Sequence, residues 1–487
     1  MPRNSVVIVG AGISGLSAAW ELSGGADGPN ELTPRIEIIE ASDHLGGLIG
    51  TREFAGRSVD LGADGFLGRR PEVVTLAREL GLEDQLEAIN ASGASIFLRG
   101  TIYELPTGLV LGVPTSPKSL RSLRGLSWRA RQAARRDFYL PRKFNVNGDV
   151  SIGAIVRAKL GDELALQVIE PMIGGIQAGR IDDLSAQSVF PGLVVAAKSG
   201  GSLMRAMAKL GAAQPGPANA APASHGAMFY SLQSGVGSLA TALADQLERR
   251  GVELRRSMPV TALRRSVDEH YPWEVDTAST TTRANALIVA TPVGVAGQLL
   301  GSHDLRLKAL LQIDSAGAAM VCFRVSRDQA NLPDQGTGVL VPLGTPWQVD
   351  ETMMITAVTF LDRKWPRLLH DDDCVLRAHV GRIDDNRWET MSDTDLTTRV
   401  AKELATLFGS WPLESDSFVA RWPNGLPQYR VGHEELIRHA NDAAGALRVA
   451  LAGNAYDGVG IPASVGSGRK AAQQVQKFLE VPESNVP

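Results

Sequence analysis

The most strongly patterned part of the sequence is an apolar run that leads into a glycine-rich turn. Val6–Val9 are four consecutive β-branched residues, as expected for a strand buried on both faces. The sequence then reads GAGISG over residues 10–15 and continues into a helical pattern around Trp20. A second apolar strand is predicted at Ile36–Ile39. This order of strand, glycine turn, helix and strand predicts the start of a parallel α/β sheet.

Similar patterns return much later in the chain. Residues 234–250 predict a capped amphipathic helix, and strands are expected at 252–255, 260–264 and 286–290. A last buried strand is expected at 447–454, followed by a final helix. Because a domain can be assembled from separated segments, we expect these stretches to join the first forty residues in one domain.

The intervening sequence predicts helices followed by a sheet. Helical patterns lie at 71–82, 150–161 and 163–173, and glycines break the last pattern at Gly174–Gly179. A single alternating strand is expected at 97–105. Further strands are predicted at 318–325, 338–341, 354–361, 375–380 and 418–422, with a helix at 393–408. This order favours a mixed or antiparallel sheet backed by helices.

Each glycine of the GAGISG turn has a separate physical task. Gly10 allows the tight turn, Gly12 lets backbone amides approach a pyrophosphate, and Gly15 lets the helix pack against the strand. The phosphates would bind at the helix N-terminus, where unpaired N–H groups and the helix dipole favour negative charge. Glu40, which ends the second strand, can accept hydrogen bonds from a ribose. These features alone predict a dinucleotide site for either a nicotinamide or a flavin cofactor.

The composition narrows the class of protein. The length of 487 residues predicts two or three domains, and a formal net charge of −4 argues against a dedicated nucleic-acid binder. The two cysteines, Cys322 and Cys374, are far apart in sequence and favour a reduced compartment. We find no apolar run long enough to span a bilayer and expect no signal peptide. The expected location is therefore the cytoplasm, with the protein soluble or peripherally attached to a membrane.

One segment, Lys118–Lys143, is strongly basic. It contains seven arginines and a single acidic residue, Asp137. Three interpretations remain open: a solvated helical face, steering of a polyanionic substrate, or adhesion to an anionic membrane through the arginines together with Trp128, Phe138 and Tyr139.

Two further patterns concern flexibility and chemistry. Residues 211–226 are rich in Ala, Pro and Gly and predict a flexible surface loop. The eight histidines are scattered, and the sequence contains no H-E-x-x-H motif, G-x-S-x-G motif or Cys/His cluster. We therefore expect neither a metal site nor a side-chain nucleophile.

Widely separated motifs resemble one group of flavoproteins. The GAGISG turn with Glu40, the Gly46-Gly47 doublet, ALIVATP at 286–292 and GNAYDGVGIPASVGSG at 453–468 are similar to the glycine-doublet FAD oxidases. This group includes amine oxidases and phytoene desaturases. Within it, the chain resembles the porphyrinogen oxidases of haem biosynthesis over nearly its whole length. That narrower resemblance rests on EPMIGGIQAGRIDDLSAQSVFP at 170–191, ELPTGLVLGVPT at 104–115 and RWPNGLPQYRVGH at 421–433.

The resemblance implies FAD as the cofactor and assigns contacts to particular residues. The phosphates would lie on the glycine turn, the ribose on Glu40, the adenine near the backbone of Val260, and the flavin against residues 459–461 with Trp422 near its ring. Gly175 would lie along the substrate. The residues assigned to FAD are Gly10, Gly12, Ile13, Ser14, Gly15, Glu40, Ala41, Gly46, Gly47, Leu48, Gly62, Ala63, Asp64, Val260, Trp422, Val459, Gly460 and Ile461.

The expected fold class is α/β with α+β insertions: a Rossmann-like FAD-binding domain assembled from separated segments, a mixed-sheet substrate domain and a helical insertion. The FAD-binding domain would comprise 1–90, 227–300 and 440–487. The substrate-binding domain would comprise 91–117, 163–210 and 301–439. A helical, arginine-rich subdomain would span 118–162, and the flexible loop 211–226.

The implied reaction is oxidation of a porphyrinogen to the porphyrin, with dioxygen as the acceptor and release of hydrogen peroxide. The flavin would carry this chemistry, so no catalytic side chain is assigned. Coproporphyrinogen III is expected as the substrate rather than protoporphyrinogen IX. Ala94 stands where eukaryotic protoporphyrinogen oxidases carry an arginine. The arginine-rich segment of this chain and its lack of a clear membrane-inserting run also resemble the soluble bacterial branch of the family. A flavin amine oxidase and a non-catalytic FAD-binding partner remain alternatives. Peripheral membrane contact and hand-over to the next haem-pathway enzyme are open expectations, and no nucleic-acid partner is expected.

Overall fold

The computed structural model describes residues 4–141, 143–213, 228–268, 270–412 and 415–480. The chain divides into two compact units. The first consists of Met1–Glu87, Phe229–Asp314 and Glu434–Pro487, and the second consists of Ala88–Met228 and Ser315–His433. None of the helices within the described ranges is both long and apolar enough to cross a bilayer.

The first unit is built on a five-stranded parallel sheet. Its strands, in spatial order, are β12 (Glu253–Arg255), β2 (Arg35–Ile39), β1 (Ser5–Val9), β16 (Ala286–Val289) and β24 (Val449–Leu451). Side chains that alternate along β1 enter two different hydrophobic cores, because each face of the sheet is covered. This double burial explains the uninterrupted β-branched run of the first strand.

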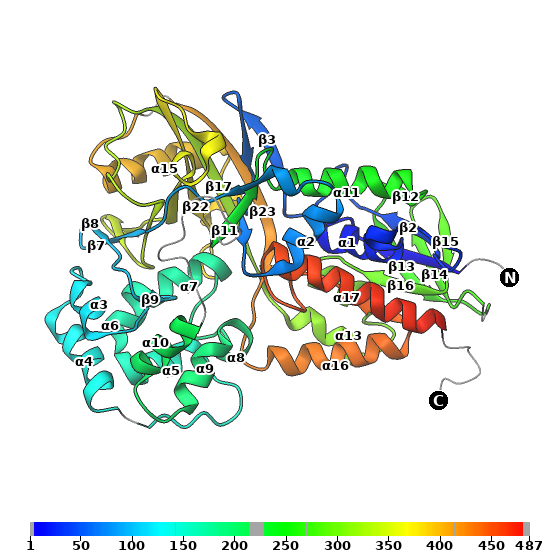
Figure 1. Cartoon of the computed structure of the whole chain (residues 1–487), viewed down its shortest axis with the longest axis horizontal. Helices are drawn as coiled ribbons and strands as arrows, with labels where there is room; N and C mark the ends of the chain where they lie inside the picture. Colours follow the sequence, from blue (N-terminus) through cyan, green and yellow to red (C-terminus); the bar gives the residue numbers. More distant parts are fainter. Residues whose placement is uncertain (1–3, 142, 214–227, 269, 413–414, 481–487) are drawn as a thin grey trace. The chain divides into compact units, whose positions relative to one another are not determined.

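Helices cover one face of this sheet, and helices with a small antiparallel sheet cover the other. Figure 1 shows α1 beside α17, and both contribute to the core on the first face. The elements of that core are α1 (Ile13–Leu22), α2 (Pro71–Glu79), α11 (Gly237–Arg249) and α17 (Ile461–Glu480). The elements on the other face are β13 (Val260–Arg265), β14 (Trp273–Thr277), β15 (Thr281–Ala284), α12 (Val293–Leu300), α13 (Leu305–Lys308) and α16 (His433–Ala446).

Shorter elements complete the first unit. They are the 3₁₀ turns η1 (Gly25–Asp27), η2 (Glu83–Gln85) and η4 (Ala309–Gln312), and the strands β3 (Thr51–Phe54), β4 (Arg57–Asp60), β5 (Phe66–Leu67), β6 (Leu86–Ala88, which ends in the second unit) and β11 (Phe229–Leu232). The buried carboxylate of Asp60 accepts hydrogen bonds from the Thr51 hydroxyl at 2.6 Å and from the Val236 N–H at 2.8 Å. This carboxylate therefore ties the β3–β4 hairpin to the start of α11.

The second unit contains a seven-stranded sheet. Its spatial order is β23 (Asp416–Pro427), β17 (Ser315–Ser326), β22 (Asp373–Val380), β21 (Ile355–Phe360), β18 (Gly338–Leu340), β7 (Ser95–Leu98) and β8 (Thr101–Glu104). Only the β18–β7 pair is parallel among these neighbours, so the sheet is mixed as expected. Helix α15 (Asp393–Phe408) packs its apolar side on one face.

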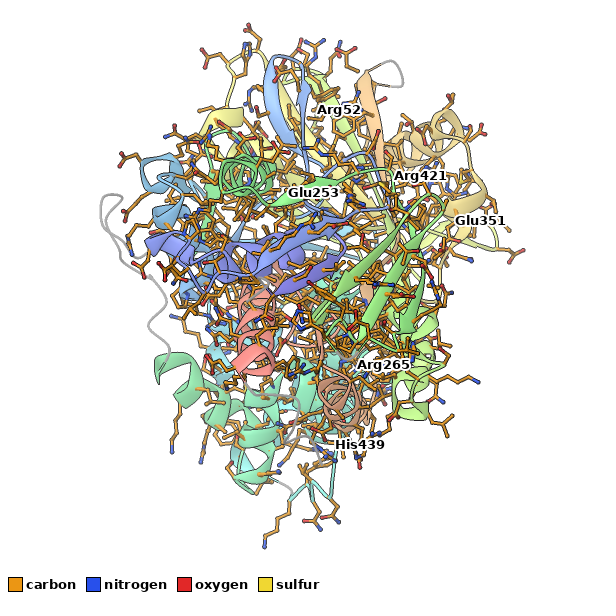
Figure 2. The ribbon with its side chains drawn as sticks, turned by 90° about the vertical axis from the view of Figure 1, so that its right-hand side faces the viewer. Arg52, Glu253, Arg265, Glu351, Arg421 and His439 are labelled. Atoms are coloured by element: carbon orange, nitrogen blue, oxygen red, sulfur yellow. The ribbon has the colours of Figure 1, made fainter. Side chains whose placement is uncertain are left out.

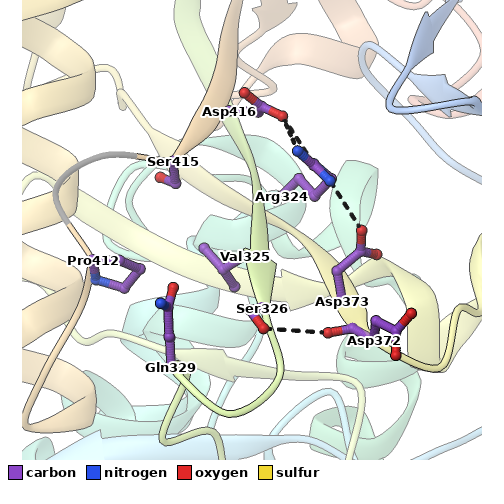
Figure 3. Close-up of a pocket in the computed structure, with 9 residues that line it drawn as sticks. All are labelled: Arg324, Val325, Ser326, Gln329, Asp372, Asp373, Pro412, Ser415 and Asp416. Carbon is purple, nitrogen blue, oxygen red and sulfur yellow. Dashed lines mark hydrogen bonds and ion pairs between the residues drawn. The ribbon is translucent and has the colours of Figure 1, made fainter.

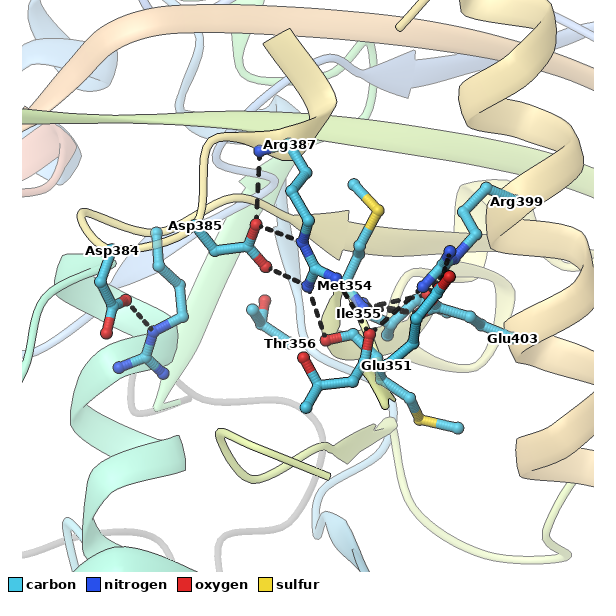
Figure 4. A network of polar contacts seen from close by, with 12 residues as sticks. Glu351, Met354, Ile355, Thr356, Asp384, Asp385, Arg387, Arg399 and Glu403 are labelled. Atoms are coloured by element: carbon cyan, nitrogen blue, oxygen red, sulfur yellow. Dashed lines mark hydrogen bonds and ion pairs between the residues drawn. The ribbon is translucent and has the colours of Figure 1, made fainter. Parts of the chain in front are cut away.

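A buried carboxylate joins α15 to an irregular point in this sheet (Figure 4). Glu403 accepts hydrogen bonds from the N–H groups of Met354 and Ile355, each at 2.9 Å, where the register of β21 shifts. Arg399 donates to Glu403 at 2.7 Å and to Glu351 at 2.6 Å. The shorter elements around this sheet are β19 (Pro346–Gln348), β20 (Glu351–Thr352), α14 (Leu361–Lys364), η5 (Pro366–Leu368) and η6 (Arg387–Thr390).

The remainder of the second unit is a group of helices with its own hydrophobic core. The helices are α3 (Pro117–Ser122), α4 (Trp128–Tyr139), α5 (Ile152–Leu160), α6 (Asp162–Leu164), α7 (Glu170–Gln177), α8 (Ala186–Val189), α9 (Pro191–Lys198) and α10 (Leu203–Ala213), together with the π-helical turn η3 (Ala165–Ile169) and the short strands β9 (Leu109–Val110) and β10 (Val113–Pro114). The expected α/β class with a Rossmann-like sheet, a mixed sheet and a helical insertion is confirmed.

Four local predictions were wrong. The strand expected at 97–105 is the β7–β8 hairpin, because Arg99 and Gly100 both adopt positive φ and form a two-residue turn. Helix α2 ends at Glu79 rather than at 82, since Gly81 with φ +73° follows it. Helix α10 continues through Ala213, the third residue of the loop expected at 211–226, and the rest of that loop lies outside the described residues. The glycines expected to break the helix at 174 lie inside α7.

Candidate functional site

The glycine turn after β1 is held by two close backbone approaches. A Cβ atom at Gly10, where φ is +102°, would lie 2.7 Å from the carbonyl oxygen of Ala290. A Cβ atom at Gly15 would lie 2.0 Å from the carbonyl oxygen of Gly10. Both distances are far below van der Waals contact, so these two glycines are required by the packing of the chain itself.

Gly12 differs from its neighbours because its side-chain position is open. A Cβ atom there would meet only the Cα atom of Gly47, at 3.9 Å. Gly46 and Gly47 have φ angles of +97° and +62°, and the Gly46 N–H donates to the Ala11 carbonyl at 2.9 Å. The glycine doublet therefore lies directly beside the turn.

The Glu40 carboxylate lies at the same turn. It accepts hydrogen bonds from the Ala11 N–H at 2.7 Å and, through its other oxygen, from the N–H and hydroxyl of Ser42 at 2.8 Å each. A carboxylate offers about four acceptor positions, so capacity remains for a ligand hydroxyl. The Glu40 carbonyl accepts from Met258 N–H, which places the chain leading to the half-buried Val260 close by.

The N-terminus of α1 adjoins these residues. Among the described residues no side chain caps this helix, and its first turn contains no acidic residue. Its first-turn N–H groups therefore suit an anionic group. Ile13 and Ser14 are buried, whereas Ala41 and Leu48 on the following loop are exposed.

A loop from the C-terminal end of the chain borders the same sheet edge. Strand β24 ends beside β16, and the Ala452 N–H donates to the Val289 carbonyl at 3.0 Å. The loop then includes Asp457, whose carboxylate accepts from Ser467 and Lys470, both at 2.7 Å. Val459 is half-buried, Gly460 is exposed, and Ile461 is the buried first residue of α17. In the 62–64 segment, Gly62 and Asp64 are buried and Ala63 is exposed.

These segments meet because β1, β2, β16 and β24 are parallel and end at one edge of the sheet. Ligands of open α/β sheets bind outside the carboxyl ends of the strands. An open glycine position, an uncapped helix N-terminus and a carboxylate at the second strand fit the pyrophosphate and ribose of a dinucleotide. Within the described part of the chain, no group of three or more His, Cys, Asp or Glu side chains is arranged to hold a metal ion.

Comparison with known proteins shows which family of dinucleotide-binding enzymes this chain belongs to. Residues 13–476 match the family model described as flavin containing amine oxidoreductase. The chain belongs to this family. It is accordingly an FAD-dependent oxidoreductase, and the expectation of FAD is confirmed.

Individual relatives of this flavin oxidoreductase match over almost their whole length. The coproporphyrinogen III oxidase of Bacillus subtilis (strain 168) is 30% identical over 98% of this chain and 99% of its own. The protoporphyrinogen oxidase of Homo sapiens is 28% identical over 97% of this chain and 98% of its own. A crystal structure from Exiguobacterium sp. 255-15, provisionally described as a protoporphyrinogen oxidase, superimposes with a TM-score of 0.85 at 30% identity, covering 98% and 99% of the two chains.

Two residues that the sequence assigned to the site of this flavin oxidoreductase belong to the second unit. Trp422 lies in β23, opposite Ala318 of β17. Gly175 lies in the middle of α7, so it is not the residue of a tight turn. It is exposed, and a Cβ atom at its position would meet nothing within 4 Å. The next residue, Ile176, is 52% exposed, so this side of α7 is free for a ligand.

The opposite side of α7 is fixed by residues that the sequence did not reveal. Arg382 donates to the Glu170 carboxylate at 2.7 Å and to the Gly179 carbonyl at 3.1 Å, and the other Glu170 oxygen accepts from Ile181 N–H. A Cβ atom at Gly174 would lie 3.0 Å from the Arg382 guanidinium. The helix continues through Gly174 because this guanidinium fills the space beside it. No local signal could reveal a pair separated by 212 positions.

A second contact holds the C-terminal end of α7. The Gln428 amide donates to the carbonyl of Gln177, the last residue of α7, at 2.8 Å. A Cβ atom at Gly179 would lie only 2.1 Å from the Gln428 side-chain oxygen. The glycines of the 170–191 motif therefore have structural roles at 174 and 179, which distinguishes them from the open Gly175.

Two surface hollows lie outside these residues. One, of about 330 Å³, is lined by Arg324, which bonds to Asp373 and Asp416 (Figure 3). The other, of about 560 Å³, lies beside Arg35 and Arg255, which both bond to Glu253 of β12 (labelled in Figure 2). The arginines named here are already bonded to carboxylates of the protein, so neither hollow offers free positive charge.

Proposed function

We propose that this protein oxidises coproporphyrinogen III to coproporphyrin III, with dioxygen as the electron acceptor and release of hydrogen peroxide. The supporting observation is end-to-end similarity to a curated coproporphyrinogen III oxidase, at 30% identity over 98% of this chain and 99% of the relative. Each product molecule requires removal of six electrons, and three dioxygen molecules would accept them. Protoporphyrinogen IX is the second candidate substrate, because the human relative named for it also matches over the full chain.

We assign the cofactor to the first unit and the substrate to the second. Bound FAD would supply the hydride acceptor. Residues 10–15 would hold its pyrophosphate, Glu40 its ribose, and residues 459–461 would contact the flavin. The protein's own contribution would be to orient the porphyrinogen and exclude water. In the second unit, the exposed side of α7 around Gly175 would contact the substrate.

Turnover of the two porphyrinogens tests the activity. Purified protein is expected to be yellow and to form fluorescent porphyrin from coproporphyrinogen III faster than from protoporphyrinogen IX, with peroxide formed in step. A preference for protoporphyrinogen IX would overturn the substrate assignment. Failure to oxidise either compound would overturn the proposed function.

Substitutions in the glycine turn test the cofactor assignment. Gly12→Val is expected to fold but to lose FAD, because its branched side chain would occupy the open position where the pyrophosphate must approach. Gly12→Ala should lose less affinity. Gly15→Ala serves as the contrasting variant and should disturb the turn itself, since its Cβ would lie 2.0 Å from a backbone oxygen. Retention of the flavin spectrum by Gly12→Val would show that the pyrophosphate binds elsewhere.

Gly175→Ala tests the substrate surface. The new methyl group meets no protein atom within 4 Å, and alanine favours a helix over glycine by about 1 kcal/mol, so stability should be unchanged or higher. If the porphyrinogen lies on this side of α7, its KM should nevertheless rise. Gly192→Ala in α9 is the matched control, because its Cβ would make only ordinary contacts of 3.6 Å or more. Equal KM values for the two variants would show that Gly175 does not contact the substrate.

We further propose a cytoplasmic location with reversible contact at a membrane surface, and hand-over of the porphyrin to the next enzyme of the pathway. The macrocycle of the porphyrin product is apolar although its propionates are charged, and direct hand-over would keep that ring system out of water. Fractionation of cells at low and high ionic strength tests the location, since a peripheral contact should release the protein into the soluble fraction when salt is raised.

A further inference from the structure

Helix α7 has two unlike sides, and their placement depends on how the helix is rotated about its axis. Glu170, Ile173 and Gln177 are buried on one side. Gly175 and Ile176 are exposed on the other. Successive residues of an α-helix are about 100° apart, so a rotation by a single residue would turn Gly175 away from the side that the porphyrinogen would contact.

A π-helical turn directly precedes α7. Helix α6, the π-helical turn η3 and α7 follow one another without a gap. Pro171 near the start of α7 has no N–H group, so it cannot donate to the carbonyl of Gln167 four residues earlier. A π-helical turn contains an extra residue and therefore shifts the phase of the helix that follows. The rotation of α7 is consequently not fixed by a regular hydrogen-bond pattern that continues from α6.

One short loop of the second unit, residues 382–385, contacts α7 at both ends. At the start of the helix, the Arg382 guanidinium donates to the Glu170 carboxylate at 2.7 Å. At its end, the Ile383 N–H donates to the carbonyl of Ala178, the capping residue, at 2.8 Å. Ala178 has a φ of +49°, an unfavourable conformation for alanine that surrounding contacts must maintain. The loop therefore holds the helix along its whole length.

The loop is itself held in one shape. Arg382 and Asp385 exchange two backbone hydrogen bonds, both of 3.1 Å. The Asp385 carboxylate accepts from the Arg387 guanidinium at 2.8 Å and 2.6 Å (Figure 4). Arg387 also donates to the Thr352 carbonyl at 3.2 Å, which ties the loop to the strands beside the seven-stranded sheet. The Arg382 side chain therefore links a fixed part of the second unit to Glu170.

We propose that Arg382 is a positioning residue for the porphyrinogen. By holding Glu170, it sets the rotation of α7 and thus the direction in which Gly175 and Ile176 meet the substrate. It acts through the helix, because its side chain is 4% exposed and donates to Glu170 and the Gly179 carbonyl. A guanidinium suits this task, since its rigid planar fork bonds two acceptors in fixed directions. This role rests on the proposed contact between the porphyrinogen and α7.

The double variant Glu170→Gln, Arg382→Met separates positioning from stability. It leaves no uncompensated buried charge, so the protein should stay folded and keep its FAD. Its KM for coproporphyrinogen III should nevertheless rise by about tenfold at nearly unchanged kcat, since a misplacement of about 1 Å can cost up to about a hundredfold. Binding of coproporphyrin III, followed by the change in its fluorescence, should weaken by the same factor.

Two further variants complete the test. Arg382→Lys keeps the positive charge beside Glu170 but loses the planar fork, so its KM should lie between those of the unchanged protein and the double variant. Glu403→Gln, Arg399→Met is the matched control, because it removes the same kind of ion pair from α15. Helix α15 packs into a different hydrophobic core from α7, so KM and porphyrin binding should be unchanged in this control.

Three results would overturn the role of Arg382. They are an unchanged KM and porphyrin affinity in the Arg382 double variant, an equal change in the α15 control, and a loss of affinity that follows thermal stability across all the variants. Failure of the unchanged protein to oxidise any porphyrinogen would instead overturn the proposed function. In that case porphyrin binding would still report whether Arg382 positions the helix.

Discussion

The ion pair between Glu170 and Arg382 is almost completely shielded from solvent within the second unit. Their side chains are 1% and 4% exposed, and the guanidinium nitrogen lies 2.7 Å from the carboxylate oxygen. Replacing Arg382 with Met removes the guanidinium but leaves the carboxylate buried, with the Ile181 N–H as its remaining donor. Breaking a buried pair from one side costs about 3–5 kcal/mol, because an uncompensated charge stays in a medium of low dielectric constant. We expect Arg382→Met to lose stability of that order.

Removing both charges should cost less than removing one. In the double variant Glu170→Gln, Arg382→Met no unpaired charge remains, so the loss should fall below about 2 kcal/mol, the scale of the missing hydrogen bonds. Arg438→Met is the exposed control. It breaks an i, i+4 pair with Asp442 in which both side chains are about 60% exposed, and should cost less than about 1 kcal/mol.

Native-state hydrogen exchange measured on peptides from residues 170–182 reports this loss locally. Such a measurement is preferable to a single melting curve, because a chain of two units need not unfold in one step. Protection of these peptides should fall strongly in Arg382→Met and recover in large part in the double variant. The reasoning is refuted if Arg382→Met changes protection no more than Arg438→Met, or if the double variant is less stable than Arg382→Met.

Two further predictions concern the first unit. Gly468→Ala in α17 should destabilise the protein and weaken FAD retention, because its Cβ would lie 2.1 Å from the Ser14 carbonyl oxygen. Gly466→Ala on the same helix is the control, because its Cβ would make only ordinary contacts. Thermal melting should show this control to be as stable as the unchanged protein or more stable. The Arg264 guanidinium lowers the pKa of Asp276 from 3.8 to about 2, so this carboxylate stabilises the fold above pH 3.8 and the contribution is lost as pH falls toward 2. Asp276→Asn should therefore reduce the loss of stability over that acidic range in urea titrations, and an unchanged acid dependence would contradict the assignment.

The elements around the glycine turn could be predicted because their signals are local. The apolar run of β1 and the spacing of Gly10 and Gly15 are contained in ten consecutive residues, and the structure places both glycines where a Cβ atom would collide with backbone. The assignments of individual residues to FAD remain predictions. They came from a resemblance between motifs, since apolar patterns specify where a strand ends but not which ligand lies beside it.

The error at α7 has a different cause, which is interaction over long sequence separations. The helical pattern was expected to stop at Gly174, but α7 continues to Gln177, and the guanidinium of Arg382, more than 200 residues away, packs beside Gly174. The helix therefore includes both Gly174, which packs against Arg382, and Gly175, whose side is open. The low helix propensity of glycine correctly marks Gly174 and Gly175 as unfavourable positions in a helix. Propensity alone could not show that a side chain distant in sequence packs beside Gly174.

The order of the parallel sheet has a consequence for how cofactor binding and folding are coupled. The segments that would hold FAD follow β1, β2 and β24, and β24 reaches the sheet only by pairing with β16, which in turn pairs with β1. An incomplete sheet would therefore lack one side of the site even if the glycine turn were formed. A ligand that binds only the complete arrangement stabilises it by RT ln(1 + [L]/Kd), or about 2.7 kcal/mol at a hundredfold excess over Kd. FAD should accordingly protect strands from both ends of the chain against hydrogen exchange together, because it selects the state in which they lie in one sheet.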